Sequence, residues 1–190
     1  CLPVPAVGVV EPAALAAVKA SGSKRIGVAG TSATINSGSF KAAIEKLEPG
    51  AKVFQQACPL FVPLVENGWI DTDDEITRLT AERYLQPMKE EGIDTLLLGC
   101  THYPLLAPVI GGILGPNVAL IDSGQATASY CAEYLKSRDM LAPGGKKGEL
   151  KFYVSDRPGD FSKVASMFLG QEIDDSVCKV DIEQITGSIC

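Results

Sequence analysis

The sequence lacks several features by which common classes of protein are recognised. It contains one histidine, so any role that needs an imidazole falls on His102. The cysteines form no CxxC pair, which indicates reduced thiols in a cytosolic protein rather than a disulfide framework. Cys100 and His102 stand two residues apart with no second cluster to complete a metal site, so no metal is expected. The six cysteines are Cys1, Cys58, Cys100, Cys131, Cys178 and Cys190.

The chain also lacks an excess of positive charge and any long apolar run. A net charge of −6 argues against a nucleic-acid binder, since phosphate contacts need clustered lysine and arginine. No apolar run approaches the length of a membrane-spanning helix, so no membrane is expected as a partner. The start at Cys1 shows no basic and apolar leader, which predicts no secretion signal, and a trimmed start is expected.

Short apolar runs alternate with amphipathic stretches of helical length, a pattern typical of an α/β fold with a parallel sheet and flanking helices. At 190 residues, 46% of them hydrophobic and 21% charged, the chain can bury a core. The predicted strands are Val7 to Val10, Arg25 to Ala29, Lys52 to Gln55, Thr95 to Gly99, Val118 to Ile121 and Lys151 to Val154. The predicted helices are Pro12 to Ala20, Gly38 to Leu47, Asp74 to Met88, Leu105 to Ile113, Gln125 to Ser137 and Asp160 to Leu169.

The helix predicted over Asp74 to Met88 has the clearest signals. Thr72 and Glu75 form a capping box before it. Pro87 is expected to kink or end it. Its predicted apolar face consists of Ile76, Leu79, Leu85 and Met88.

Glycine and proline divide the chain into parts. Gly115-Pro116 marks a boundary, so residues 1–116 are expected to form one α/β lobe and residues 117–190 part of another. Residues 142–148 are expected to form a surface loop or linker. From about Asn117 onward, the chain is expected to expose apolar surface.

In open parallel sheets, ligands bind beyond the carboxyl ends of the strands. After the strand that begins at Arg25, the turn with Thr31 and Thr34 offers hydroxyls and backbone amides to a carboxylate or phosphate. These hydroxyls could equally just cap the next helix. Asp122, after a later strand, is interpreted as such a cap.

The turn Cys100-Thr101-His102 follows another predicted strand and precedes Pro104, a typical first-turn proline. Amide dipoles at a helix start would stabilise a thiolate, and a neighbouring imidazole could exchange its proton. The alternatives are an inert packed cysteine and a histidine that is simply hydrogen-bonded. Glu66 could orient His102 as a carboxylate partner, or it could be a solvated residue at a helix end.

Five sequence blocks resemble glutamate racemase, within the cofactor-independent aspartate/glutamate racemase family. They are Val7-Gly8-Val9-Val10-Glu11-Pro12, Gly27 to Thr34 with Ser37-Gly38, Cys58 to Glu66, Leu98-Gly99-Cys100-Thr101-His102-Tyr103-Pro104-Leu105, and Ile121-Asp122-Ser123-Gly124. The resemblance implies a two-lobed enzyme in which two cysteines face opposite sides of the α-carbon of glutamate. One thiolate removes the α-proton while the opposite thiol donates one, without pyridoxal phosphate, another cofactor or a metal.

The resemblance also implies roles for particular residues. Cys100 is the cysteine of the second lobe, and His102 sets its protonation. Thr31, Thr34 and Thr101 hold the polar groups of the substrate, and Glu66 positions His102. The implied setting is a cytoplasmic bacterial homodimer that supplies D-glutamate for peptidoglycan.

One departure from the family pattern bears on activity. The Ala-Cys-Asn-Thr segment that supplies the first cysteine in the family is not present here. Residues 1–116 therefore match the second lobe, residues 117–190 match the returning tail of the first, and this chain alone is expected to be inactive. The alternatives are an aspartate or other amino-acid racemase, a non-catalytic module that binds an amino acid, and a hydrolase or transferase that uses Cys100 and His102.

Overall fold

The computed structural model describes residues 4–144, 148–173 and 177–181 of the chain. The chain divides into two compact units, Cys1–Leu141 and Ala142–Cys190. Cys1 and Cys190, two of the cysteines in the sequence, lie outside the described residues. The polar turns singled out in the sequence all belong to the first unit.

The first unit is built on a four-stranded parallel sheet. Its strands are β1 (Arg25–Gly30), β2 (Lys52–Ala57), β3 (Thr95–Leu98) and β4 (Ala119–Asp122), in the order β2-β1-β3-β4. The α/β fold with a parallel sheet is therefore confirmed, with these four strands close to their predicted bounds. The strand predicted over Val7 to Val10 is wrong, because residues 4–9 are exposed and unpaired with the sheet, and Val10 already begins a helix.

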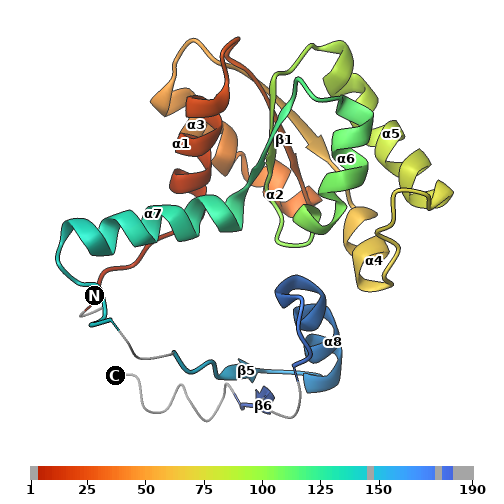
Figure 1. The fold of residues 1–190 in the computed structure, drawn as a ribbon. Coiled ribbons are helices and arrows are strands. Elements are labelled where there is room, and N and C mark those ends of the chain that lie inside the picture. The colour runs from red at the N-terminus through yellow and green to blue at the C-terminus, as the bar shows by residue number, and fades with distance from the viewer. Residues whose placement is uncertain (1–3, 145–147, 174–176, 182–190) are drawn as a thin grey trace. The chain divides into compact units, whose positions relative to one another are not determined.

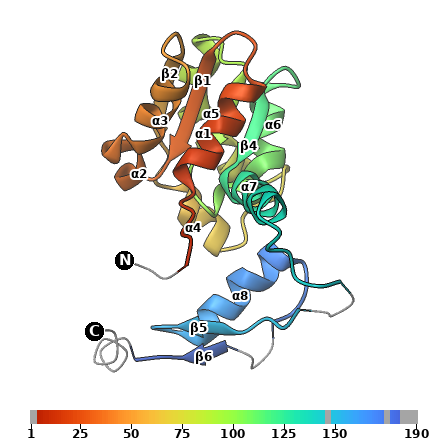
Figure 2. The ribbon, with the colours of Figure 1, turned by 90° about the vertical axis from the view of Figure 1, so that its left-hand side faces the viewer.

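Helices cover both faces of this sheet, as Figures 1 and 2 show. Helix α1 packs against α3 and α7 on one face, and α5 packs against α6 on the other. Among the described residues, no helix combines the length and apolar character needed to cross a membrane. The elements of this unit are α1 (Val10–Ala20), α2 (Ser32–Ser37), α3 (Ser39–Leu47), α4 (Phe61–Glu66), α5 (Glu75–Glu90), the 3₁₀ helix η1 (Tyr103–Leu106), α6 (Ala107–Leu114) and α7 (Ser123–Ser137).

The core on the α1 side is built from small helical residues against branched strand residues. Ala13, Ala14 and Ala17 of α1 are fully buried, which lets the helix lie close to the sheet. Phe40 and Ile44 of α3 complete the packing against the strands. A tightly packed sheet gives the turns at its carboxyl edge a rigid base.

Helix α5 differs from its prediction in three respects. Asp74 is its N-cap, with a carboxylate that accepts a hydrogen bond from the Thr77 amide at 2.8 Å, so the Thr72 capping box is not used. Pro87 neither ends nor breaks the helix, which continues to Glu90. Its buried residues are Thr77, Ala81, Leu85 and Met88, whereas the side chains of Ile76 and Leu79 are 55% and 49% exposed. The prediction is therefore confirmed for Leu85 and Met88 and wrong for Ile76 and Leu79, whose places on the buried face are taken by Thr77 and Ala81.

Within its described residues, the second unit contains a two-stranded parallel sheet and one helix. These are β5 (Phe152–Val154), β6 (Val177–Lys179) and α8 (Pro158–Leu169). Phe152 and Phe161 pack together with ring centroids 5.8 Å apart. The predicted strand and helix of this region are confirmed, and β6 was not predicted.

The compact units divide after Leu141, and the lobe boundary expected at residues 116 and 117 stays a prediction. Strand β4 follows that point, yet it pairs in register with β3, from Thr95 opposite Ala119 to Leu98 opposite Asp122. Helix α7 then packs on α1. Residues 117–141 thus belong to the first compact unit, because the ladder holds them there.

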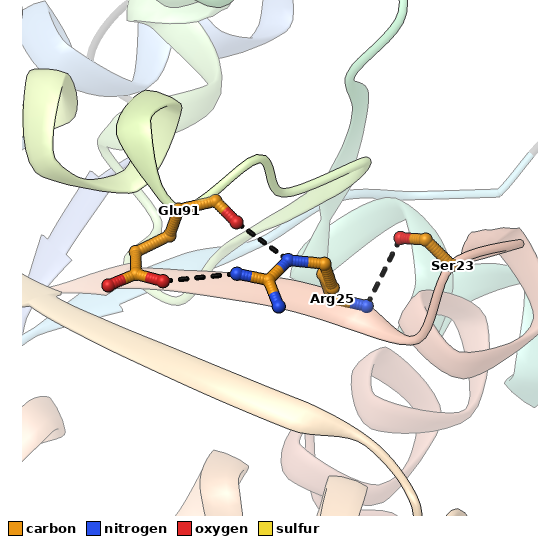
Figure 3. A network of polar contacts seen from close by, with 3 residues as sticks. All are labelled: Ser23, Arg25 and Glu91. Atoms are coloured by element: carbon orange, nitrogen blue, oxygen red, sulfur yellow. Dashed lines mark hydrogen bonds and ion pairs between the residues drawn. The ribbon is translucent and has the colours of Figure 1, made fainter.

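A polar network fixes the amino ends of the strands, opposite the edge where ligands bind in such sheets. Figure 3 shows Arg25 donating from Nε to the carbonyl oxygen of Glu91 at 2.6 Å and from Nη2 to its carboxylate at 3.0 Å. Nearby, Asp94 accepts hydrogen bonds from the Ser21 hydroxyl and the Ser23 amide, each at 2.6 Å. Partial burial would raise the pKa of Asp94, but the hydrogen bonds from Ser21, Ser23 and Thr95 outweigh it and lower the pKa to about 2.

Candidate active site

The candidate residues lie at the carboxyl edge of the four-stranded sheet. Ala29 pairs with Leu98, so Thr31 and Cys100 each follow a paired position by two residues. The Gly99 amide donates to the Ala29 carbonyl at 2.8 Å, which ties the two strand ends together. The sequence correctly placed these turns on one edge because parallel strands end on the same side.

Close packing explains why a glycine precedes Cys100. A Cβ at Gly99 would stand 2.9 Å from the Phe40 ring and 3.2 Å from the Ala29 carbonyl oxygen. Only a residue without a side chain lets β3 end this close to β1. Gly99 therefore allows the chain to remain close to β1 up to the residue before Cys100.

Cys100 is half-buried, and its Sγ lies 3.9 Å from Nδ1 of His102. Burial raises the pKa of this thiol above its ordinary value, although contacts with the His102, Thr101 and Tyr103 region pull it in the opposite direction. The predicted stabilisation of the thiolate at a helix start is therefore smaller than the opposing effect of desolvation on the pKa. The helix that follows is the four-residue η1, which offers fewer aligned amides than a full α-helix.

His102 contacts three candidate residues. Its Nδ1 lies 3.3 Å from Oγ1 of Thr101 in addition to the Cys100 sulfur, and its Nε2 lies 3.4 Å from Oε1 of Glu66. A carboxylate on the Nε2 side favours the tautomer that carries its proton there, which leaves Nδ1 as an acceptor toward the thiol. The arrangement can pass a proton between Cys100 and the imidazole.

Glu66 reaches His102 from the end of α4, an element that the sequence did not predict. The Glu66 side chain is 51% exposed and that of His102 is 21% exposed. Both interpretations of Glu66 are therefore met in part, because it is a half-exposed residue at a helix end and it also contacts His102.

Thr31 and Thr34 form one hydroxyl pair at the end of β1. Their Oγ1 atoms lie 3.0 Å apart, and Oγ1 of Thr31 accepts a hydrogen bond from the Thr34 amide at 3.2 Å. Thr31 is therefore the N-cap of α2, as the capping interpretation stated. Asp122 likewise caps α7, accepting from the Gly124 and Gln125 amides at 2.7 and 3.2 Å.

Tyr103 and Cys58 form a contact at this edge that the sequence did not reveal. Both residues are fully buried, and the Tyr103 hydroxyl donates to the Cys58 carbonyl oxygen at 2.8 Å. Burial raises the pKa of the Cys58 thiol to about 12, so this cysteine is a packed, neutral group. A tyrosine beside a histidine gives no sequence signal for such a contact, because its partner is a backbone atom.

In the part of the chain that the structure describes, no three His, Cys, Asp or Glu side chains gather as a metal site would require. The residues that meet at the sheet edge are instead a thiol, an imidazole, a carboxylate and hydroxyls. This set suits proton transfer beside a small polar molecule.

Several relatives match most of this chain. It is 46% identical over 182 residues to a glutamate racemase of Geobacter metallireducens, covering 96% of this chain and 66% of that protein. A glutamate racemase of Syntrophus aciditrophicus is 44% identical over 171 residues, covering 90% of this chain and 63% of that protein. The chain therefore spans less than two thirds of the length of these relatives.

Solved structures show the same fold. Glutamate racemase RacE1 of Bacillus anthracis matches with a TM-score of 0.87 at 36% identity, covering 96% of this chain and 66% of that one. A glutamate racemase of Francisella tularensis, solved in complex with D-glutamate, matches with a TM-score of 0.84 at 31% identity, with the same two coverages. Residues 1–131 match the family described as Asp/Glu/Hydantoin racemase. The chain belongs to this racemase family.

Proposed function

We propose that this chain is part of a glutamate racemase, in which Cys100 carries a proton to or from the α-carbon of glutamate. The observation that carries the proposal is the chain of contacts from the Cys100 sulfur through His102 to Glu66 at the carboxyl edge of the sheet. Similarity to glutamate racemases of 46% and 44% identity supports glutamate as the substrate. The complex of the Francisella tularensis relative with D-glutamate supports the same choice.

The proposed reaction needs two groups on opposite sides of the substrate. A single base would return the proton to the face it left, whereas two opposed thiols invert the centre. The raised pKa of Cys100 makes the neutral thiol its resting form, which suits a proton donor. When Cys100 acts as the base, Nδ1 of His102 first takes the thiol proton, and Glu66 stabilises the resulting imidazolium.

The hydroxyls at the edge hold the substrate in this scheme. Thr31 and Thr34 lie just after the end of β1, the strand next to β3, and Thr101 adjoins Cys100 in the chain, so all three can donate to carboxylate or accept from ammonium. Stabilising the carbanion that develops at the α-carbon requires such fixed donors in a site closed to water. No cofactor or metal takes part in the proposed chemistry.

The proposal assigns the first α/β unit to the lobe that carries Cys100, and the end of the chain to the returning tail of the other lobe. Exposed apolar residues in the second unit support an incomplete lobe: Leu150 and Tyr153 are 63% and 60% exposed. The opposing cysteine would come from the other lobe. In the cell the enzyme is a cytoplasmic homodimer that supplies D-glutamate for peptidoglycan.

A circular-dichroism assay with L- and D-glutamate tests the function. The 190-residue chain alone is expected to show no turnover. A chimera, in which the part of the Geobacter metallireducens relative that precedes the matched region is joined to Cys1, is expected to racemise glutamate. Within the chimera, Cys100→Ser should abolish turnover, and Cys131→Ser should retain it.

Each result has a distinct meaning. Turnover by the chain alone that Cys100→Ser removes contradicts the need for the cysteine of the first lobe. A folded chimera that turns over despite Cys100→Ser contradicts the role of this thiol. A folded chimera that racemises aspartate and not glutamate favours the alternative substrate within the family, and one that binds glutamate without turnover favours a binding module.

A further inference from the structure

The buried hydroxyl of Tyr103 connects the turn that carries Cys100 and His102 to the segment after β2 that leads into α4. Its Oη donates to the Cys58 carbonyl oxygen at 2.8 Å, and the Cys58 amide in turn donates to the Gly30 carbonyl oxygen at 2.9 Å. The Tyr103 amide donates to the Cys100 carbonyl oxygen at 3.2 Å, which closes the turn from Cys100 to Tyr103. One residue therefore links the ends of β1, β2 and β3.

The Tyr103 ring makes a second link, to the helix that carries Glu66. It packs edge-to-face on Phe61, with centroids 5.1 Å apart and planes at 83°. Phe61 is the first residue of α4 and Glu66 the last, so the ring holds α4 from its start. On its other side Phe61 packs edge-to-face on Tyr84 of α5, at 5.4 Å.

If Tyr103 served only to fill the core, its hydroxyl would not be needed. Burying a hydroxyl is unfavourable unless it forms a hydrogen bond, so phenylalanine would fill the same space without this requirement. The hydrogen bond is directional, and it sets where the turn with His102 lies relative to α4. The two atoms of the His102 to Glu66 contact come from these two elements and are 3.4 Å apart.

We infer that Tyr103 is a positioning residue, which holds the Cys100 to His102 turn against α4 so that Glu66 reaches His102. The consequence for catalysis rests on the proposed function, whereas the consequence for the His102 to Glu66 contact does not. Misplacing a reacting group by about 1 Å can cost on the order of 100-fold in rate. Tyr103 acts through His102 and Glu66 and does not itself touch the substrate in this scheme.

The experiment uses the fact that His102 is the only histidine, so its ring signals in an NMR spectrum need no assignment. In the 190-residue chain, Glu66→Gln should shift these signals. In the Tyr103→Phe background, the shift caused by Glu66→Gln should fall to less than about half. Tyr84→Phe removes a hydroxyl from the same aromatic cluster and should leave the full shift.

In the chimera, Tyr103→Phe should lower kcat about tenfold and leave KM within about twofold, as expected for a misplaced proton carrier. The inference is overturned if Glu66→Gln shifts the His102 signals equally in the parent chain and in the Tyr103→Phe background. If Tyr103→Phe fails to fold, Phe61→Leu tests the ring link in the same way, with the same expected loss. A chimera without turnover, together with a 190-residue chain whose His102 signals still show this dependence, contradicts the proposed function and leaves the positioning role intact.

Discussion

Oε1 of Glu66 lies 3.4 Å from Nε2 of His102, although one residue ends α4 and the other precedes η1. The contact exists because β2 and β3 flank β1 and deliver their following turns to one edge of the sheet. It gives the only imidazole in the sequence a carboxylate on one side and the Cys100 thiol on the other. Several measurements probe this arrangement and the scaffold beneath it.

Replacing Glu66 with glutamine in the chimera should lower kcat by roughly 10- to 100-fold, because the amide cannot stabilise an imidazolium as a carboxylate does. Stability should change by less than about 0.5 kcal/mol, since the side chain is exposed. The racemase assay and urea unfolding measure the two effects. Glu82→Gln, an exposed residue of α5 that pairs with Arg78, is the control and should leave kcat unchanged.

The rate at which iodoacetamide alkylates Cys100 should keep rising above pH 9. Burial raises the pKa of this thiol, and the thiolate is the reactive form. Peptide mass spectrometry can follow Cys100 and the exposed Cys178 in the same sample, so that the second residue reports the reagent itself. A plateau in the Cys100 rate below pH 9 would show that the turn stabilises the thiolate more than burial opposes it.

Cys58 should make the fold sensitive to alkali. Its pKa is raised to about 12 in the folded protein, so an unfolded thiol ionises first and stability falls as pH rises from about 9 toward 12. The loss relative to neutral pH should reach about 1.5–2 kcal/mol at pH 10. Urea unfolding of Cys58→Ala should show a flatter alkaline limb than the parent. Cys178→Ala is the matched control and should keep the slope.

Asp94 should make the fold sensitive to acid. Its folded pKa of about 2 lies below the unfolded value, so its contribution is present above about pH 4 and is lost as pH falls toward 2. We expect Asp94→Asn to cost about 1–2 kcal/mol at pH 7, allowing for partial exposure to solvent. The variant should also lose less stability than the parent between pH 4 and 2. The exposed Asp73→Asn is the control and should lose stability between pH 4 and 2 as the parent does. An equal loss in Asp94→Asn and the parent would contradict the lowered pKa of Asp94.

The sequence was sufficient to predict the parallel sheet, because buried strands such as β1 and β3 are short apolar runs that end in glycine and polar turns. It was also sufficient to predict which turns carry polar side chains to the edge. It assigned half of the buried face of α5 correctly, but it chose the larger apolar residues Ile76 and Leu79 where Thr77 and Ala81 are in fact buried. Only the tertiary packing decides between such faces.

Other features depend on contacts that no local pattern encodes. The short helices α2 and α4 are held by neighbours rather than by their own propensity, so they carry no periodic signal. The Tyr103 hydrogen bond ends on a backbone oxygen, and the raised pKa of Cys100 reflects how deeply the turn is packed. Glu66 could be suggested as a partner of His102, but the distance between them needed the fold.

The central claim is that the Cys100 sulfur faces bound glutamate, and protection from alkylation tests it most directly. The chimera is treated with iodoacetamide at several concentrations of D- or L-glutamate, and the modified peptides are counted by mass spectrometry. The claim predicts that glutamate slows alkylation of Cys100 in a saturable way while Cys178 reacts at a constant rate. An unchanged Cys100 rate at glutamate concentrations that saturate turnover would contradict it.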